Sequence, residues 1–142
     1  MRILLLELPV HIPTVMPYSI TMMKSVLSSC LNEEISILDL NAEFHYNEYK
    51  EYYLRKEKED YFVVLDEFVN QARHDYSKIS KSAIHGELPN GHQEMMKLIL
   101  KKKPDIVAMS LAYNSQIFFA SGIIDELNKK GIKVVVGGPA DK

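Results

Sequence analysis

The chain of 142 residues contains a single cysteine, Cys30. One cysteine cannot form an internal disulfide, which fits a reducing, cytoplasmic setting. It also cannot supply the ligands of an iron–sulfur cluster or of a cysteine-rich zinc site. His45, His74, His85 and His92 have no spacing that is typical of a metal site.

Long apolar runs and an excess of one charge are also absent. The apolar start of the chain is interrupted by Glu7, Pro9 and His11, so it is neither a signal peptide nor a membrane span. Lysine and arginine total 17, aspartate and glutamate total 19, and the formal charge is -2. Nothing in this balance requires a nucleic acid or an anionic membrane as partner. We therefore expect one soluble domain with neither partner.

Several glycine-containing motifs are missing as well. No Gly-x-Gly-x-x-Gly follows the first apolar run, and no Gly-x-x-x-x-Gly-Lys-Ser/Thr loop occurs. Gly-x-Ser-x-Gly is absent too. The sequence therefore lacks the fingerprints of dinucleotide-binding domains, of phosphate-loop proteins and of α/β-hydrolases.

Four short apolar segments are typical of parallel strands that are covered on both faces. Apolar residues at helical spacing lie between them, and Asn114 is suited to cap the last helix. This order predicts a flavodoxin-like or Rossmann-like, doubly wound α/β domain with right-handed crossovers, truncated after the fourth strand. The predicted strands are Arg2–Leu8, Ile35–Leu40, Asp105–Leu111 and Ile132–Val136.

The interval between the second and third predicted strands, about residues 42–103, is interpreted as a variable helical insertion. Apolar residues at helical spacing predict helices through Tyr61–Ala72 and Met95–Leu100. Ser77–Gly91 is predicted to be a loop. The tyrosine-rich stretch Phe44–Glu59 is interpreted as helical, with tyrosines that cover the sheet or a domain interface rather than a ligand.

Four segments, spread over nearly the whole chain, form a set that is recognisable by its order. They are Arg2-Ile3-Leu4-Leu5-Leu6 with the proline-rich loop Pro9–Pro17, Ile37-Leu38-Asp39-Leu40-Asn41, Lys103-Pro104-Asp105-Ile106-Val107-Ala108-Met109-Ser110, and Lys133-Val134-Val135-Val136-Gly137-Gly138-Pro139. Together they resemble the cobalamin (vitamin B12)-binding domains that precede radical S-adenosylmethionine (SAM) catalytic domains. Residues 1–142 would be such a domain, in incomplete form.

The resemblance implies a cofactor and a partner domain. In such enzymes cobalamin carries a methyl group between SAM and a substrate, or serves related radical chemistry. The 4Fe-4S cluster and SAM are bound through a Cys-x-x-x-Cys-x-x-Cys motif, which this chain lacks. We therefore expect a downstream radical SAM domain in the same polypeptide, of methyltransferase or related activity, and no catalytic residue in this chain.

The expected cofactor site lies at the carboxyl ends of the strands, where open α/β sheets bind their ligands. Glycine allows a bulky ligand to approach the backbone, and a serine hydroxyl can bond a polar ligand tail. By the resemblance, Ser110, Gly137 and Gly138 line the slot for the nucleotide tail of cobalamin. Serines at strand ends and glycine pairs in turns also occur for structural reasons alone. The expected cofactor-binding residues are Pro9, His11, Ser110, Leu111, Gly137, Gly138 and Pro139.

The cobalt ligand is the point at which the sequence departs from the best-known pattern. Cobalamin domains often carry Asp-x-His-x-x-Gly after the first strand, where the histidine binds cobalt and the aspartate orients it. Here the corresponding stretch keeps only the histidine, His11, while Pro9 and Thr14 occupy the aspartate and glycine positions. His11 is therefore the candidate cobalt ligand, without the motif's aspartate.

Other interpretations stay open at this point. The fold could serve as a cofactor-free docking or substrate-recognition module, or bind a small nucleotide in the same crevice. The chain could be a fragment of a longer protein or a short protein whose sheet edge is covered by something else. Either account predicts self-association through the exposed sheet edge, because an unpaired strand edge invites pairing.

Overall fold

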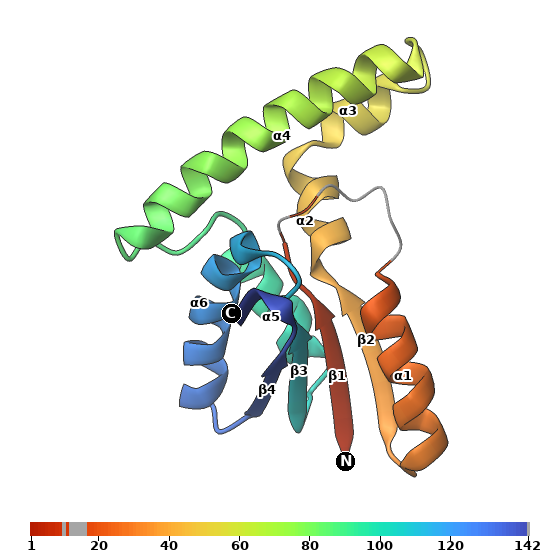
Figure 1. Cartoon of the computed structure of the whole chain (residues 1–142), viewed down its shortest axis with the longest axis vertical. Coiled ribbons are helices and arrows are strands. Elements are labelled where there is room, and N and C mark those ends of the chain that lie inside the picture. Colours follow the sequence, from red (N-terminus) through yellow and green to blue (C-terminus); the bar gives the residue numbers. More distant parts are fainter. Residues whose placement is uncertain (10, 12–16, 142) are drawn as a thin grey trace.

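The computed structural model describes residues 1–9, 11 and 17–141 (Figure 1). Its centre is a four-stranded, all-parallel sheet in the order β2-β1-β3-β4, flanked by helices. This architecture confirms the predicted flavodoxin-like α/β class. The elements are β1 (Arg2–Glu7), α1 (Tyr18–Cys30), β2 (Glu34–Asp39), α2 (Leu40–Glu48), α3 (Lys50–Arg55), α4 (Tyr61–Ile84), α5 (His92–Lys101), β3 (Ile106–Ser110), α6 (Asn114–Lys129), β4 (Lys133–Gly137) and the short 3-10 helix η1 (Pro139–Asp141).

The strand β1 lies between β2 and β3 and is buried on both faces. Leu4, Leu5 and Leu6 are at most 1% exposed, as expected for an interior strand of a parallel sheet. Leu4 and Leu6 belong to the larger core, which also contains residues of α2, α4, α5 and α6. Ile3 and Leu5 face the other way and pack with Ile20 of α1. Successive side chains of β1 therefore stabilise two separate layers.

The ends of the strands differ slightly from the predicted ones. Leu40 was expected to end the second strand but begins α2, because the Asp39 side chain accepts a hydrogen bond from the Ala42 N–H at 2.8 Å. The predicted cap of the last helix is also shifted. Asn114 is the first helical residue rather than the cap, and the side chain of Gln116 accepts the N–H of Tyr113.

The predicted loop Ser77–Gly91 is wrong in its first half. Helix α4 continues to Ile84, and only residues 85–91 lie outside helices. The reason is that Ile79 still packs against the core, while the Ser80 hydroxyl donates to the carbonyl of Tyr76. A serine whose hydroxyl bonds a carbonyl of the preceding turn is compatible with a helix. The polar composition of this stretch was therefore not sufficient evidence for a loop.

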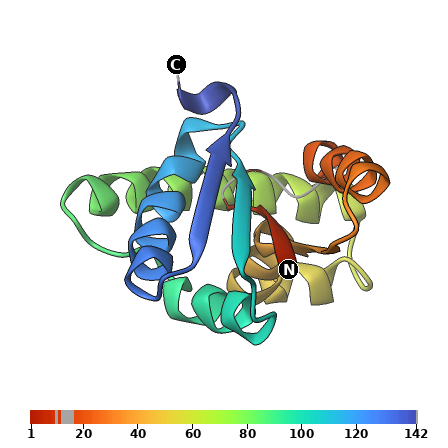
Figure 2. The ribbon, with the colours of Figure 1, turned by 90° about the horizontal axis from the view of Figure 1, so that it is seen from below.

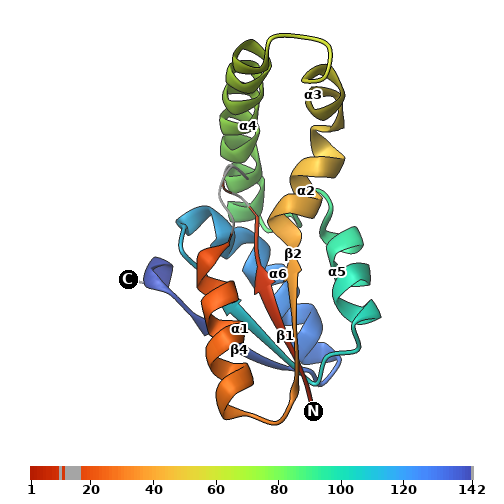
Figure 3. The ribbon, with the colours of Figure 1, turned by 90° about the vertical axis from the view of Figure 1, so that its right-hand side faces the viewer.

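The interval around residues 42–103 contains the helices α2, α3, α4 and α5. Helices α3 and α4 form a hairpin that projects beyond the carboxyl ends of the strands (Figure 3). On one face of the sheet, α1 packs on β1 and β2, whereas α6 lies on the opposite side beside β4 (Figure 2). Among residues 1–9, 11 and 17–141, no helix combines the length and the apolar character needed to cross a bilayer.

Candidate functional site

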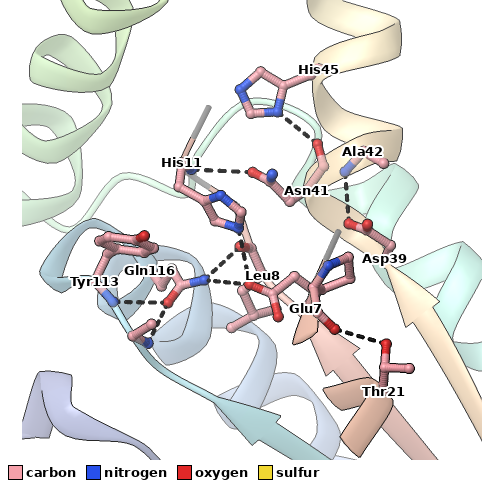
Figure 4. Close-up of polar contacts among 12 residues, drawn as sticks. Glu7, Leu8, His11, Thr21, Asp39, Asn41, Ala42, His45, Tyr113 and Gln116 are labelled. Atoms are coloured by element: carbon pink, nitrogen blue, oxygen red, sulfur yellow. Dashed lines mark hydrogen bonds and ion pairs between the residues drawn. The ribbon is translucent and has the colours of Figure 1, made fainter. Parts of the chain in front are cut away.

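Polar side chains gather where β1 ends, at the carboxyl edge of the sheet (Figure 4). Glu7, the last residue of β1, is 5% exposed. Its Oε1 accepts hydrogen bonds from His11 Nε2 at 3.0 Å and from Gln116 Nε2 at 3.2 Å. The His11 ring also lies against the ring of Tyr113, with centroids 5.3 Å apart. A carboxylate and an imidazole are therefore held together at the place where ligands of this fold bind.

The side chain of Gln116 occupies the space between the ends of β1 and β3. It is fully buried, and its Oε1 accepts the backbone N–H groups of Ala112 and Tyr113 at 2.7 and 3.0 Å. Its Nε2 donates to the carbonyl of Leu8 at 2.9 Å as well as to Glu7. Gln116 thus satisfies backbone groups beyond the ends of both strands.

Sequence reasoning missed both Glu7 and Gln116. Glu7 entered only as an interruption of an apolar run. For Gln116 a signal existed, because a glutamine three residues after a helix cap often bonds the backbone N–H of that cap. The pairing of Gln116 with Glu7 had no local signal, because the two residues are 109 positions apart in the sequence.

Asn41 links this edge to the helical hairpin. It is 2% exposed, and its side-chain Oδ1 accepts the backbone N–H of His11 at 3.2 Å. Its carbonyl accepts a hydrogen bond from His45 Nδ1 at 2.7 Å, and the other ring nitrogen of His45 bonds the hydroxyl of Tyr76 in α4. Burial lowers the pKa of His45 to about 4, the hydrogen bond to Asn41 opposing this and the nearby His11 adding to it.

A second group of predicted residues lies where β3 and β4 end. Ser110 pairs with Gly137 in the parallel register, and the Leu111 N–H donates to the Gly137 carbonyl at 2.7 Å. Gly138 has φ +123, and a Cβ there would lie 2.2 Å from the Leu111 carbonyl oxygen. Its lack of a side chain is therefore required by the chain's own backbone, whatever binds nearby.

The face of β3 and β4 on the side of α1 is only partly covered. Side chains alternate along a strand, so Ala108 and Ser110 share this face, opposite the buried Val107 and Met109. On β4 the corresponding pair is Val135, which is 57% exposed, and Gly137. A Cβ at Gly137 would meet no atom within 4 Å. Small residues therefore line a shallow strip, the Ser110–Gly137 strip, defined as Ala108, Ser110, Val135 and Gly137.

All seven residues expected to bind a cofactor lie at or beyond the carboxyl ends of β1, β3 and β4. Their surroundings differ, however. Buried Pro9 and half-buried His11 lie beyond β1, while exposed Pro139 begins η1. Leu111 is 6% exposed and belongs to the larger core, so its side chain points away from a ligand. Residues 10 and 12–16 of the proline-rich loop lie outside the described residues.

The described part of the chain contains no group of three or more histidine, cysteine, aspartate or glutamate side chains placed to hold a metal ion. Comparison of the chain with protein-family models, with curated proteins and with solved structures found no match. A functional assignment therefore depends on the quoted sequence segments and on the geometry of the carboxyl edge.

Proposed function

We propose that this chain is a cobalamin-binding domain that serves a radical SAM catalytic domain in the same polypeptide. The observation that carries the proposal is the pairing of Ser110 with Gly137 on a partly uncovered face at the carboxyl edge. Both residues belong to the segments that resemble the family. Ligands of open α/β sheets bind at this edge, which agrees with the position of the strip.

The Ser110–Gly137 strip suits the flat nucleotide tail of a corrinoid. Gly137 leaves the backbone accessible, because no atom lies within 4 Å of the position that a Gly137 Cβ would take. The half-buried Ser110 hydroxyl makes no hydrogen bond with any described residue, so it can bond a polar group of the tail. Gly138 and Leu111 contribute through the backbone, because they fix the turn against the strip.

The Glu7–His11 pair suits an imidazole that faces cobalt. Proteins orient metal-binding histidines by giving one ring N–H a carboxylate or carbonyl partner, and Glu7 supplies such a carboxylate at 3.0 Å. It stands in for the aspartate that the sequence lacks at position 9. A cobalt ion inside a corrin ring needs only one further protein ligand, so no larger cluster is required. When bound, cobalamin would supply a carrier for a methyl group, while the chain would hold and orient it.

Two corrinoids test the strip and the histidine separately. Cobalamin carries the nucleotide tail and cobinamide lacks it. In Ser110→Leu a leucine should fill the strip and weaken cobalamin binding at least about tenfold, with little change for cobinamide. Ser77→Leu, on the exposed side of α4, is the matched control and should bind both corrinoids like the wild type. Equal losses for the two corrinoids would remove the strip from the proposal.

The histidine is tested with the cob(II)inamide form, whose electron paramagnetic resonance spectrum reports an axial nitrogen ligand. Because cobinamide has no base of its own, a nitrogen coupling in the bound state has to come from the protein. We expect this coupling in the wild type, its loss in His11→Ala, and a weaker complex in Glu7→Gln. A spectrum without nitrogen coupling in the wild type would exclude His11 as ligand while leaving the tail strip to the binding measurement.

A further inference from the structure

A pocket is lined mainly by residues of α3 and α4. These two helices project beyond the carboxyl ends of the strands (Figure 3). Its volume is about 200 Å³. Drug-sized ligands and cofactors usually occupy about 300–1,000 Å³, so this pocket suits a group no larger than one ring system. The pocket is lined by Tyr52, Tyr53, Lys56, Tyr61, Val64, Leu65 and Phe68.

The rim of the pocket carries a positive charge without an ionic partner. Lys56 Nζ lies 5.4 Å from the centre of the Tyr53 ring and forms no ion pair with any described residue. The neighbouring Arg55 differs, because its guanidinium bonds Glu59 and Glu67, each at 2.8 Å. Lys56 is therefore the one charged residue among those that line the pocket, and an anionic group beside it would be complementary.

Exposed aromatic rings lie next to two of the residues that line the pocket. Tyr46 is 52% exposed and its ring centre lies 5.8 Å from that of Tyr53. Phe62 is 76% exposed and lies 5.5 Å from Tyr61. Each ring contacts a residue that lines the pocket, so the apolar surface runs on beyond the cavity itself. A single small molecule would leave these rings in water, whereas an extended chain would cover them.

We propose that this pocket binds an aromatic side chain of an acidic peptide segment from a partner protein, with Lys56 pairing the carboxylate next to it. The size of the pocket selects one ring, the lysine selects negative charge, and the flanking rings select a peptide over a free aromatic acid. Aromatic anchors in small pockets are typical of such interfaces. The proposal does not rest on corrinoid binding, because the pocket and the strip share no residue.

A tryptophan peptide provides the test, because the chain contains no tryptophan of its own. An acetylated and amidated Gly-Asp-Trp-Glu-Gly peptide is titrated with the full chain, and its fluorescence is excited at a wavelength that tyrosine does not absorb. We expect a saturable blue shift. Lys56→Met should weaken binding about fivefold, in line with an ion pair of about 1 kcal/mol at a protein surface. Lys58→Met, an exposed lysine in the same turn, is the matched control and should have no effect.

Two further measurements separate charge from shape. The amide peptide Gly-Asn-Trp-Gln-Gly should bind the wild type as weakly as the acidic peptide binds Lys56→Met, with no further loss when both changes are combined. Leu65→Phe places a ring in the pocket and should weaken binding at least about tenfold, with circular dichroism confirming the fold. The proposal is overturned if no saturable shift occurs, if Lys58→Met loses as much as Lys56→Met, or if N-acetyltryptophan amide binds as tightly as the peptide.

Discussion

The stability of the protein should fall steeply in mild acid because His45 is buried in its neutral form. Its Nδ1–H donates to the Asn41 carbonyl, which can only accept, so Nε2 must accept the Tyr76 hydroxyl. A proton on Nε2 would reverse the bond to Tyr76, whose hydroxyl would then have to accept, and would place a charge in a site that is 0% exposed. Burial accordingly lowers the pKa of His45 from 6.5 to about 4.

The magnitude follows from this pKa difference. The unfolded chain takes up a proton below pH 6.5, whereas the folded chain does so only near pH 4, so stability is constant above 6.5 and is lost as the pH falls between these values. At about 1.4 kcal/mol for each pH unit, the free energy of unfolding should decrease by about 3 kcal/mol through His45 alone. Urea denaturation followed by circular dichroism at a series of pH values measures the decrease.

The matched variant is His45→Phe, which keeps a ring of similar size and removes the titration. It should be less stable than the wild type at pH 7, because two buried polar partners lose their hydrogen bonds. Between pH 6.5 and 4, however, the free energy of unfolding of the variant should fall by about 3 kcal/mol less than that of the wild type, which is the contribution assigned to His45. If wild type and variant show parallel curves over this range, the buried neutral histidine is not the cause and the reasoning fails.

Four substitutions test the packing of the carboxyl edge and of α6. Gly138→Ala should lower the free energy of unfolding by about 2 kcal/mol or more, because of the positive φ of Gly138 and the overlap of a Cβ with a backbone oxygen. Gly137→Ala should be near neutral, and urea denaturation of both variants measures the difference. Gln116→Leu should destabilise the protein by about 3 kcal/mol, since the loss of the four hydrogen bonds of Gln116 leaves buried groups unpaired. A cost below about 1 kcal/mol would contradict that network. Gly122→Ala would bring a Cβ to 2.8 Å from Cδ2 of Leu88, a side chain that is 60% exposed and can move aside, so thermal unfolding should show a change below about 1 kcal/mol.

The parallel sheet could be predicted because each strand is a short, mainly apolar run that is separated from the next by helices. Leu4, Leu5 and Leu6 form a continuous apolar run, which is typical of a strand that is buried on both faces. The length of α4 could not be predicted in the same way. Its second half is mostly polar, and the packing of Tyr76 and Ile79 against a core that is distant in sequence helps to keep it helical.

The position of Ser110 and Gly137 at one edge of the sheet could be predicted, but the contacts around that edge could not. Ser110 and Gly137 follow strands, so the parallel sheet brings them to one edge, where they pair directly. The buried Glu7 and Gln116 were not foreseen, because their contact joins residues that only the tertiary fold brings together. The same holds for Gly138, whose role is a close approach to the Leu111 backbone that no local motif reveals.

The central claim is that the carboxyl edge of this sheet binds cobalamin, and equilibrium dialysis of the full chain against hydroxocobalamin tests it most directly. The account predicts saturable binding with one corrinoid per chain, and a raised melting temperature, because a ligand that binds only the folded state stabilises it by about 2.7 kcal/mol at a hundredfold excess over its dissociation constant. It predicts that Ser110→Leu abolishes most of this binding while Ser77→Leu does not. Retention of hydroxocobalamin no greater than that of an unrelated protein, or equal binding by both variants, would contradict the account.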